Sequence, residues 1–283
     1  MHAITFGTQN AYAPLGQGTW RMGTDPSLFA QEVEILRDGI RQNLRVIDTA
    51  AMYADGGAEK VVGEAVRPQR DTVFIVTKVW PTHASYDGVL SSLKNSLERL
   101  GTDYVDLFLL HWPSAHYPLK ETMRAMAAVY DKGWAKAIGV SNFNVDLLRQ
   151  AQQLLGSIPL TANQVEYSLM ARAAEITVIP YCQDHNMTVM AYSPIKHLNL
   201  LPHHSAERTT LKDIAAQYGV TEQTIALGWV IRHSGVIAIP KTSHKDHLLS
   251  NLRAINIHLT KEDIKRLDRV FPPSSEDLPV QRL

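Results

Sequence analysis

The sequence Val46-Ile47-Asp48-Thr49-Ala50-Ala51-Met52-Tyr53 places a carboxylate and then a phenol directly after an apolar run that begins at Leu44. Such a run is typical of a buried strand, and a charge at its end needs a partner because an unpaired buried charge is costly. Lys78, at the end of the next apolar run, is the natural cation. A lysine beside Tyr53 would lower the pKa of the phenol, since a nearby positive charge favours the phenolate. The same residues also fit a packing role, with Asp48 or Thr49 capping a helical turn and Tyr53 half-buried.

The composition is that of an ordinary globular protein. The chain has 283 residues, 45% of them hydrophobic and 20% charged, with 28 basic and 28 acidic side chains. This balance gives no indication of a nucleic-acid or membrane partner. The single cysteine, Cys182, excludes an internal disulfide. We see neither a signal peptide nor an apolar run of the roughly 20 residues that cross a bilayer, and we therefore expect a cytoplasmic protein.

Eight apolar runs rich in Val, Ile and Leu alternate with segments of helical periodicity. The runs are residues 15–19, 44–48, 73–78, 105–111, 137–141, 161–164, 188–192 and 236–241. The helical patterns cover 61–66, 89–100, 119–130, 147–154, 208–218 and 221–233, and a last one begins at Thr260. Runs without polar alternation are typical of parallel strands covered on both faces. We predict an α/β fold, a (β/α)8 TIM barrel that occupies residues 1–283 as a single domain, with an N-terminal β-hairpin in residues 4–14.

The alternative architecture is an open, doubly wound parallel sheet. That fold usually carries Gly-x-Gly-x-x-Gly between its first strand and helix. The nearest match, Gly16-Gln17-Gly18, lacks the third glycine. The barrel is therefore the better prediction.

In a barrel, functional side chains gather where the strands end. The predicted strand ends are all polar or aromatic: Thr19-Trp20, Asp48, Lys78, His111, Ser141-Asn142, Gln164, Tyr192-Ser193 and Lys241-Thr242. Among them, Asp48 would keep Lys78 charged, Lys78 would favour ionisation of Tyr53, and His111 would orient a carbonyl oxygen. These four residues predict acid–base chemistry on an oxygen that gains negative charge.

The motifs around these positions resemble the aldo-keto reductase family, with seven of them in the family's order over residues 15 to 255. They are Asp48-Thr49-Ala50-x-x-Tyr53, Thr77-Lys78, Leu110-His111-Trp112-Pro113, Ile138-Gly139-Val140-Ser141-Asn142-Phe143, Asn163-Gln164-Val165-Glu166-Tyr167, Ala191-Tyr192-Ser193-Pro194 and Ile239-Pro240-Lys241. The chain is most similar to bacterial small-carbonyl reductases of the methylglyoxal or diketogluconate reductase type. The resemblance implies an oxidoreductase, a monomer, that uses NADPH, with NADH expected to be weaker.

The resemblance also implies roles for individual residues. Tyr53 would be the general acid, tuned by Lys78 and Asp48, while His111 orients the carbonyl. The nicotinamide would be held by Ser141, Asn142 and Gln164 and would stack on Tyr192. The adenosine end would lie at Lys241, Thr242 and Asn251. The whole predicted cofactor site is Thr19, Ser141, Asn142, Gln164, Tyr192, Ser193, Lys241, Thr242, His247 and Asn251.

One position departs from the family pattern. His247 stands where many relatives carry an arginine that stacks on adenine and pairs with the 2′-phosphate. Histidine is mostly neutral at pH 7, so part of the discrimination in favour of NADPH is expected to be lost, unless Lys245 compensates.

Three tryptophans beside strand ends, Trp20, Trp80 and Trp112, predict an aromatic-lined substrate cleft. The loop after His111 and the tail after Phe271 are short, which favours an open site for small aldehydes, α-dicarbonyls such as methylglyoxal, or keto-sugars. We predict no metal site, because the histidines lack paired-ligand spacing at strand ends. A Schiff-base aldolase using Lys78 and an NADPH-binding redox sensor are the other functional alternatives.

Overall fold

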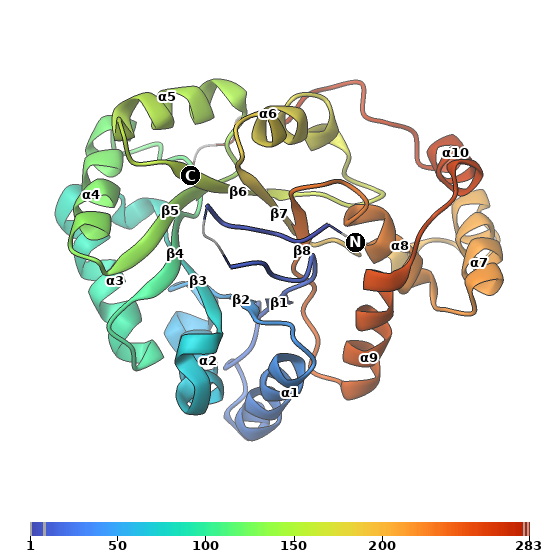
Figure 1. Cartoon of the computed structure of the whole chain (residues 1–283), viewed down its shortest axis with the longest axis horizontal. Helices are drawn as coiled ribbons and strands as arrows, with labels where there is room; N and C mark the ends of the chain where they lie inside the picture. The colour runs from blue at the N-terminus through green and yellow to red at the C-terminus, as the bar shows by residue number, and fades with distance from the viewer. Residues whose placement is uncertain (1, 8–9, 280, 282) are drawn as a thin grey trace.

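The computed structural model, which describes residues 2–7, 10–279, 281 and 283, confirms the barrel (Figure 1). Eight parallel strands pair in chain order from β1 to β8. Parallel bridges from Leu15 to Ala238 and from Gly18 to Lys241 join the first strand to the last. The strands are β1 (Gln17–Gly18), β2 (Val46–Asp48), β3 (Phe74–Val79), β4 (Val105–Leu110), β5 (Ala135–Ser141), β6 (Leu160–Glu166), β7 (Thr188–Tyr192) and β8 (Val236–Ala238).

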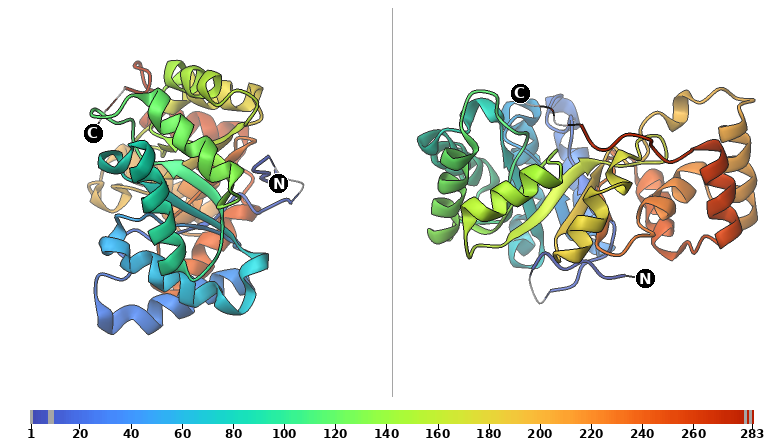
Figure 2. Two further views of the ribbon diagram at one scale, coloured as in Figure 1. Left: turned by 90° about the vertical axis from the view of Figure 1, so that its left-hand side faces the viewer. Right: turned by 90° about the horizontal axis from the view of Figure 1, so that it is seen from above.

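Helices surround the sheet and cover its outer face (Figures 1 and 2). They are α1 (Phe29–Arg41), α2 (Gly57–Val66), α3 (Tyr86–Leu100), α4 (Leu119–Asp131), α5 (Val145–Leu155), α6 (Val178–Asp184), α7 (Ala206–Tyr218), α8 (Glu222–Val230), α9 (Lys245–Arg253) and α10 (Lys261–Val270). A capping box starts α10, since the Thr260 hydroxyl and the Asp263 carboxylate each accept the other's backbone N–H. Among the described residues, no helix is both long and apolar enough to cross a membrane.

The barrel interior is an apolar cluster separate from the larger hydrophobic core that includes the helices, and its members include Val46, Val76, Leu109, Ala162, Met190 and Ile239. Side chains alternate across a strand, so the residue two positions further on faces the same side. The next inward positions on these strands are Asp48, Lys78, His111, Gln164, Tyr192 and Lys241. Because of this two-residue period, the polar side chains at the strand ends lie directly above the apolar barrel interior.

Strand β5 provides only small residues to this interior. A Cβ atom at Gly139 would lie 2.6 Å from the carbonyl oxygen of Ala162 and 2.7 Å from a methyl group of Leu109. Glycine is therefore required there, because both neighbouring strands already occupy the space.

The structure refines several of the sequence predictions. Ile4 pairs antiparallel with Tyr12, as the predicted hairpin requires, while residues 8 and 9 lie outside the described residues. Strand β8 ends at Ala238 and not at Lys241, since Pro240 has no N–H to continue the ladder. Helices α1 and α9 were not predicted. The apolar stripe Val33, Leu36 and Ile40 of α1 carries a readable helical signal.

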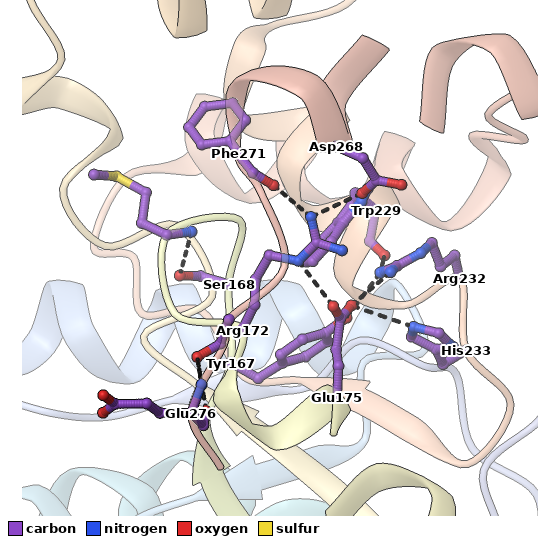
Figure 3. Close-up of polar contacts among 12 residues, drawn as sticks. Tyr167, Ser168, Arg172, Glu175, Trp229, Arg232, His233, Asp268, Phe271 and Glu276 are labelled. Carbon is purple, nitrogen blue, oxygen red and sulfur yellow. Dashed lines mark hydrogen bonds and ion pairs between the residues drawn. The ribbon is translucent and has the colours of Figure 1, made fainter. Parts of the chain in front are cut away.

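A buried polar cluster around Glu175 fixes the segment that follows β6 (Figure 3). The Glu175 carboxylate accepts hydrogen bonds from the Tyr167 hydroxyl at 2.5 Å, from Arg232 at 2.6 Å and from Arg172 at 2.8 Å. Burial alone would raise the pKa of Glu175, but nearby His233 and the hydrogen bonds from Tyr167 and the two arginines outweigh it and hold this pKa far below its usual range. Glu175 is therefore ionised at neutral pH.

Arg172 extends this cluster to the C-terminal end of the chain. Its guanidinium also donates to Asp268 at 2.7 Å and to the carbonyl of Phe271. The ring of Trp229 lies between the two arginines (Figure 3). Its centroid is 4.9 Å from the Cζ atom of Arg172 and 3.7 Å from that of Arg232. The cluster therefore ties the loop after β6 to α8 and α10 through charge-assisted hydrogen bonds.

We expect Glu175→Gln to lower the free energy of unfolding at pH 7 by about 2–3 kcal/mol, because it removes the carboxylate that two arginines share in a site that is only slightly exposed. The folded pKa is depressed, so the stabilisation is complete above the unfolded pKa of about 4.3 and is lost as the pH falls below it. Denaturant unfolding from pH 7 to 3 should show the difference from wild type shrinking. Glu98→Gln, on the exposed face of α3, is the control. A pH-independent difference would show that Glu175 acts by shape alone.

Candidate active site

The centre of the site is a buried ion pair between neighbouring strands β2 and β3. The Lys78 ammonium donates to the Asp48 carboxylate at 2.8 Å, to the Thr49 carbonyl at 2.7 Å and to the Tyr53 hydroxyl at 3.3 Å. Gln164, on the opposite side of the barrel, donates its amide to the other Asp48 oxygen at 2.6 Å. Lys78 is fully buried and Asp48 is 2% exposed. Both carboxylate oxygens accept from groups that can only donate, so the pair is ionised.

Burial and the neighbouring charges shift the pKa of Lys78 in opposite directions. Burial lowers the pKa of Lys78, but Asp48 and then Tyr53 more than compensate, so the pKa of Lys78 lies above its usual value. A lysine that stays protonated does not form a Schiff base, which disfavours the aldolase alternative.

The structure corrects the predicted pKa of Tyr53. Lys78 does favour the phenolate, as expected, but burial has the larger effect and the pKa of Tyr53 is raised above its usual value. In this environment the phenol is a protonated, weak acid. The side chain reaches Lys78 because Tyr53 opens a tight turn in which Ala54 and Asp55 have φ near +50° before α2 begins at Gly57.

His111 stands beside the phenol at the end of β4. Its ring centroid lies 5.7 Å from that of Tyr53 and 5.1 Å from that of Trp80, both edge-on. Burial and then the charge of Lys78 lower the pKa of His111 well below its usual value, so the ring is neutral at pH 7. Its Nδ1 atom is buried and has no hydrogen-bond partner among the described residues.

A second network of hydrogen bonds crosses the ends of β5, β6 and β7. The Tyr192 hydroxyl donates to the Asn142 Oδ1 atom at 3.0 Å, and the Asn142 amide donates to the His111 carbonyl at 3.1 Å and to the Ser141 hydroxyl at 3.0 Å. Ser141 in turn donates to the carbonyl of Gln164 at 2.8 Å. Asn142 has a φ of 62°, a conformation that asparagine tolerates better than most residues. These hydrogen bonds hold Tyr192 and His111 in fixed positions.

These groups face a cleft of about 560 Å³ at the carboxyl ends of the strands. Twelve of the predicted residues line it: Thr19, Trp20, Asp48, Tyr53, Trp80, His111, Trp112, Asn142, Gln164, Tyr192, Ser193 and Lys241. The ring of Trp20 packs edge-on against Tyr53 at 4.9 Å, although Trp20 is half exposed. The cleft has the size and the aromatic wall of a small-molecule site.

The other predicted residues lie outside the cleft lining. Lys78 lies beneath Tyr53, and Ser141 is 1% exposed. Thr242 and Asn251 line a narrow hollow next to the cleft, and His247 lies on exposed α9, where its ring packs edge-on against His244. Lys245 lies 3.6 Å from Asp38 and is largely exposed, so it has a partner away from the cleft.

Sequence reasoning missed the segment after β7. Pro194, Ile195, Lys196, His197 and Asn199 all line the cleft, as does Met52. The signal was present in the strand-end motif Tyr192-Ser193-Pro194, because a loop that follows a strand end in a barrel borders the site.

A second cavity of about 380 Å³ adjoins the cleft and shares Trp112, Asn142 and Tyr192 with it. The C-terminal tail forms part of its wall through Pro272 and Leu278. Leu283 at the end of the tail pairs with the backbone of Pro113 and Ala115. The short tail therefore reaches across to the loop after β4 and bounds the site on that side. Among the residues that the structure describes, no cluster of His, Cys, Asp and Glu is placed to hold a metal ion.

Comparison of this sequence with known proteins finds a family model and several related enzymes. The family model described as "Aldo/keto reductase family" matches residues 14–271. Methylglyoxal reductase YeaE of Escherichia coli (strain K12) is 40% identical over 95% of this chain and 94% of its own length. Glyoxal reductase of Bacillus subtilis (strain 168) is 32% identical over 84% and 83% of the two chains.

Solved structures agree with the sequence matches. An aldo/keto reductase from Klebsiella pneumoniae in complex with NADP and acetate superposes with a TM-score of 0.91 at 40% identity, covering 100% of this chain and 99% of its own. An aldo-keto reductase of the same organism in complex with NADPH gives a TM-score of 0.92 with the same identity and coverage. With its eight-stranded barrel and its match along most of the chain, this protein belongs to the aldo/keto reductase family.

Proposed function

We propose that this protein is an NADPH-dependent oxidoreductase that reduces small aldehydes and ketones to alcohols. α-Dicarbonyls such as methylglyoxal, or keto-sugars, are the expected substrates. The observation that carries the proposal is the position of Tyr53, which lines the cleft while its hydroxyl accepts a hydrogen bond from the Lys78 ammonium. The methylglyoxal and glyoxal reductases among its relatives support this substrate class.

The residues present fit a nicotinamide dinucleotide. The cleft offers the aromatic ring of Tyr192 for stacking and the amide groups of Asn142 and Gln164 for a carboxamide. We assign Lys241, which lines the cleft, to the 2′-phosphate, because an ammonium–phosphate contact is a strong charge-assisted one. NADPH, when bound, supplies the hydride. The Klebsiella structures with NADP and NADPH support this choice of cofactor.

The protein's own residues supply the proton and the orientation of the substrate. We assign Tyr53 as the general acid, because its hydroxyl is protonated and the residue lines the cleft. Lys78 offsets part of the burial effect on the phenol and would stabilise the phenolate after transfer. His111, being neutral, can donate an N–H to the carbonyl oxygen without bringing a charge. Trp20, Trp80 and Trp112 would wall the apolar part of the substrate.

The remaining predictions are extensions of this proposal. We propose that the chain acts as one domain and as a monomer in the cytoplasm. Sedimentation analysis of the purified protein at micromolar concentration tests the monomer directly.

Tyr53→Phe should lower kcat for methylglyoxal and for a simple aromatic aldehyde by about 10²–10⁴-fold, the usual contribution of a general acid. The variant keeps the ring packing against Trp20. Its Kd for NADPH, measured by fluorescence titration, should change little. Loss of coenzyme binding together with activity would show that Tyr53 has a structural role.

Lys78→Met should lower the free energy of unfolding by about 3–5 kcal/mol, because it leaves the Asp48 carboxylate buried without its cation. Adding Asp48→Asn should restore part of this stability, since it removes the unpaired charge. Urea unfolding of the two single variants and the double variant measures the coupling. Additive losses would mean that the ion pair contributes no interaction of its own.

His247→Arg should tighten NADPH binding about tenfold while leaving the Kd for NADH nearly unchanged, because only NADPH carries a 2′-phosphate for the new guanidinium to pair with. Titration of both coenzymes checks the ratio. Equal changes for the two coenzymes would place His247 away from the 2′-phosphate.

A further inference from the structure

A buried carboxylate outside the barrel is connected to both Tyr53 and Lys78. Glu59, on α2, is fully buried, and each of its oxygens accepts a hydrogen bond. The Thr77 hydroxyl donates to Oε1 at 2.6 Å, and the Arg99 Nε atom donates to Oε2 at 2.6 Å. Neither Glu59 nor Arg99 is among the described residues that line the cleft. The pair can therefore act on the reaction only through other residues.

The first connection runs through β3. Successive side chains of a strand point to opposite faces of the sheet, so Thr77 faces the helices while Lys78 faces the barrel interior. The hydrogen bond from Thr77 to Glu59 ties the backbone beside Lys78 to α2. Helix α2 begins at Gly57, directly after the turn that carries Tyr53. One carboxylate thus joins the strand of the lysine to the helix that follows the phenol.

The second connection runs through the tight turn that opens at Tyr53. Ala54 and Asp55 have φ of 50° and Gly56 has φ of 85°. A left-handed conformation at two successive non-glycine residues is unfavourable, and it persists only where the surrounding structure holds it. Arg99, from α3, lies against the backbone of this turn, because a Cβ atom at Gly56 would collide with its Cδ and Nε atoms. The same Nε atom is the one that donates to the buried carboxylate.

The contact that these connections control is sensitive to small displacements. The Lys78 ammonium and the Tyr53 hydroxyl are 3.3 Å apart, at the long end of the range for hydrogen bonds. A shift of the turn away from β3 by a few tenths of an ångström would break this bond. Misplacement of a reacting group by about 1 Å can lower a rate by roughly 10²-fold.

We propose that Glu59 and Arg99 are positioning residues for the proton transfer. Through Thr77 and Arg99, the Glu59 carboxylate holds the Tyr53 hydroxyl within hydrogen-bond distance of Lys78. This inference rests on the proposed function, in which Tyr53 is the general acid. Loss of the pair slows the chemical step and leaves coenzyme binding unchanged, because neither side chain touches the cleft.

The test is a single turnover of NADPH with methylglyoxal. Its amplitude reports the folded fraction of the enzyme, and its rate constant reports the chemical step. Arg99→Met should lower this rate constant by about 10–100-fold without changing the Kd for NADPH. Thr77→Val, which removes only the hydroxyl, should lower it severalfold, Thr77→Ser should restore it, and these two variants decide the matter if Arg99→Met does not fold. Arg41→Met, which breaks an exposed ion pair with Glu34, is the matched control and should have no effect.

A double-variant cycle separates positioning from a general loss of structure. Tyr53→Phe leaves no hydroxyl to position, so adding Arg99→Met should lower its residual rate constant by less than about twofold. A further loss as large as that in the wild-type background would overturn the proposal, as would unchanged rate constants in Arg99→Met and Thr77→Val. A rise in the Kd for NADPH that matches the loss in rate would also overturn it, by assigning the pair to the coenzyme site. Absence of turnover in the wild type would instead contradict the proposed function, and this inference with it.

Discussion

The buried ion pair of Asp48 and Lys78 is the constraint on which the rest of the site depends. Two opposite charges are stable on top of an apolar barrel interior only if every donor and acceptor is matched. The structure meets this condition with Thr49, Tyr53 and Gln164, which come from β6 and from the residues after β2. The pair thereby fixes the phenol of Tyr53 and couples opposite sides of the barrel.

The barrel architecture explains why so many polar groups converge above an apolar core. Inward positions recur every two residues, so a strand that provides Val76 or Leu109 to the interior provides Lys78 or His111 to the cleft. Outside the barrel, the Glu175 cluster joins the loop after β6 to α10 through hydrogen bonds between charged groups. Arg172 belongs to that cluster and lines the second cavity, so the wall of this cavity is anchored by buried charge.

The functional groups divide into two regions with different electrostatics. The Tyr53 region is buried, and its pKa values are shifted by burial and by Lys78. The region of Lys241 and α9 is exposed, and the Lys241 ammonium donates to the Ser243 hydroxyl. Proton transfer is suited to the first region and recognition of phosphate to the second.

The eight strands, their parallel order and the residues that meet at the strand ends could all be predicted from the sequence, because local periodicity and short motifs carry that information. The pairing of Asp48 with Lys78 was predictable too, since a buried carboxylate requires a cation. The raised pKa of Tyr53 and the lining of the cleft by the segment after β7 became apparent only from the folded structure. Each of these depends on burial or on contacts between segments distant in sequence, and such contacts exist only once the barrel has closed.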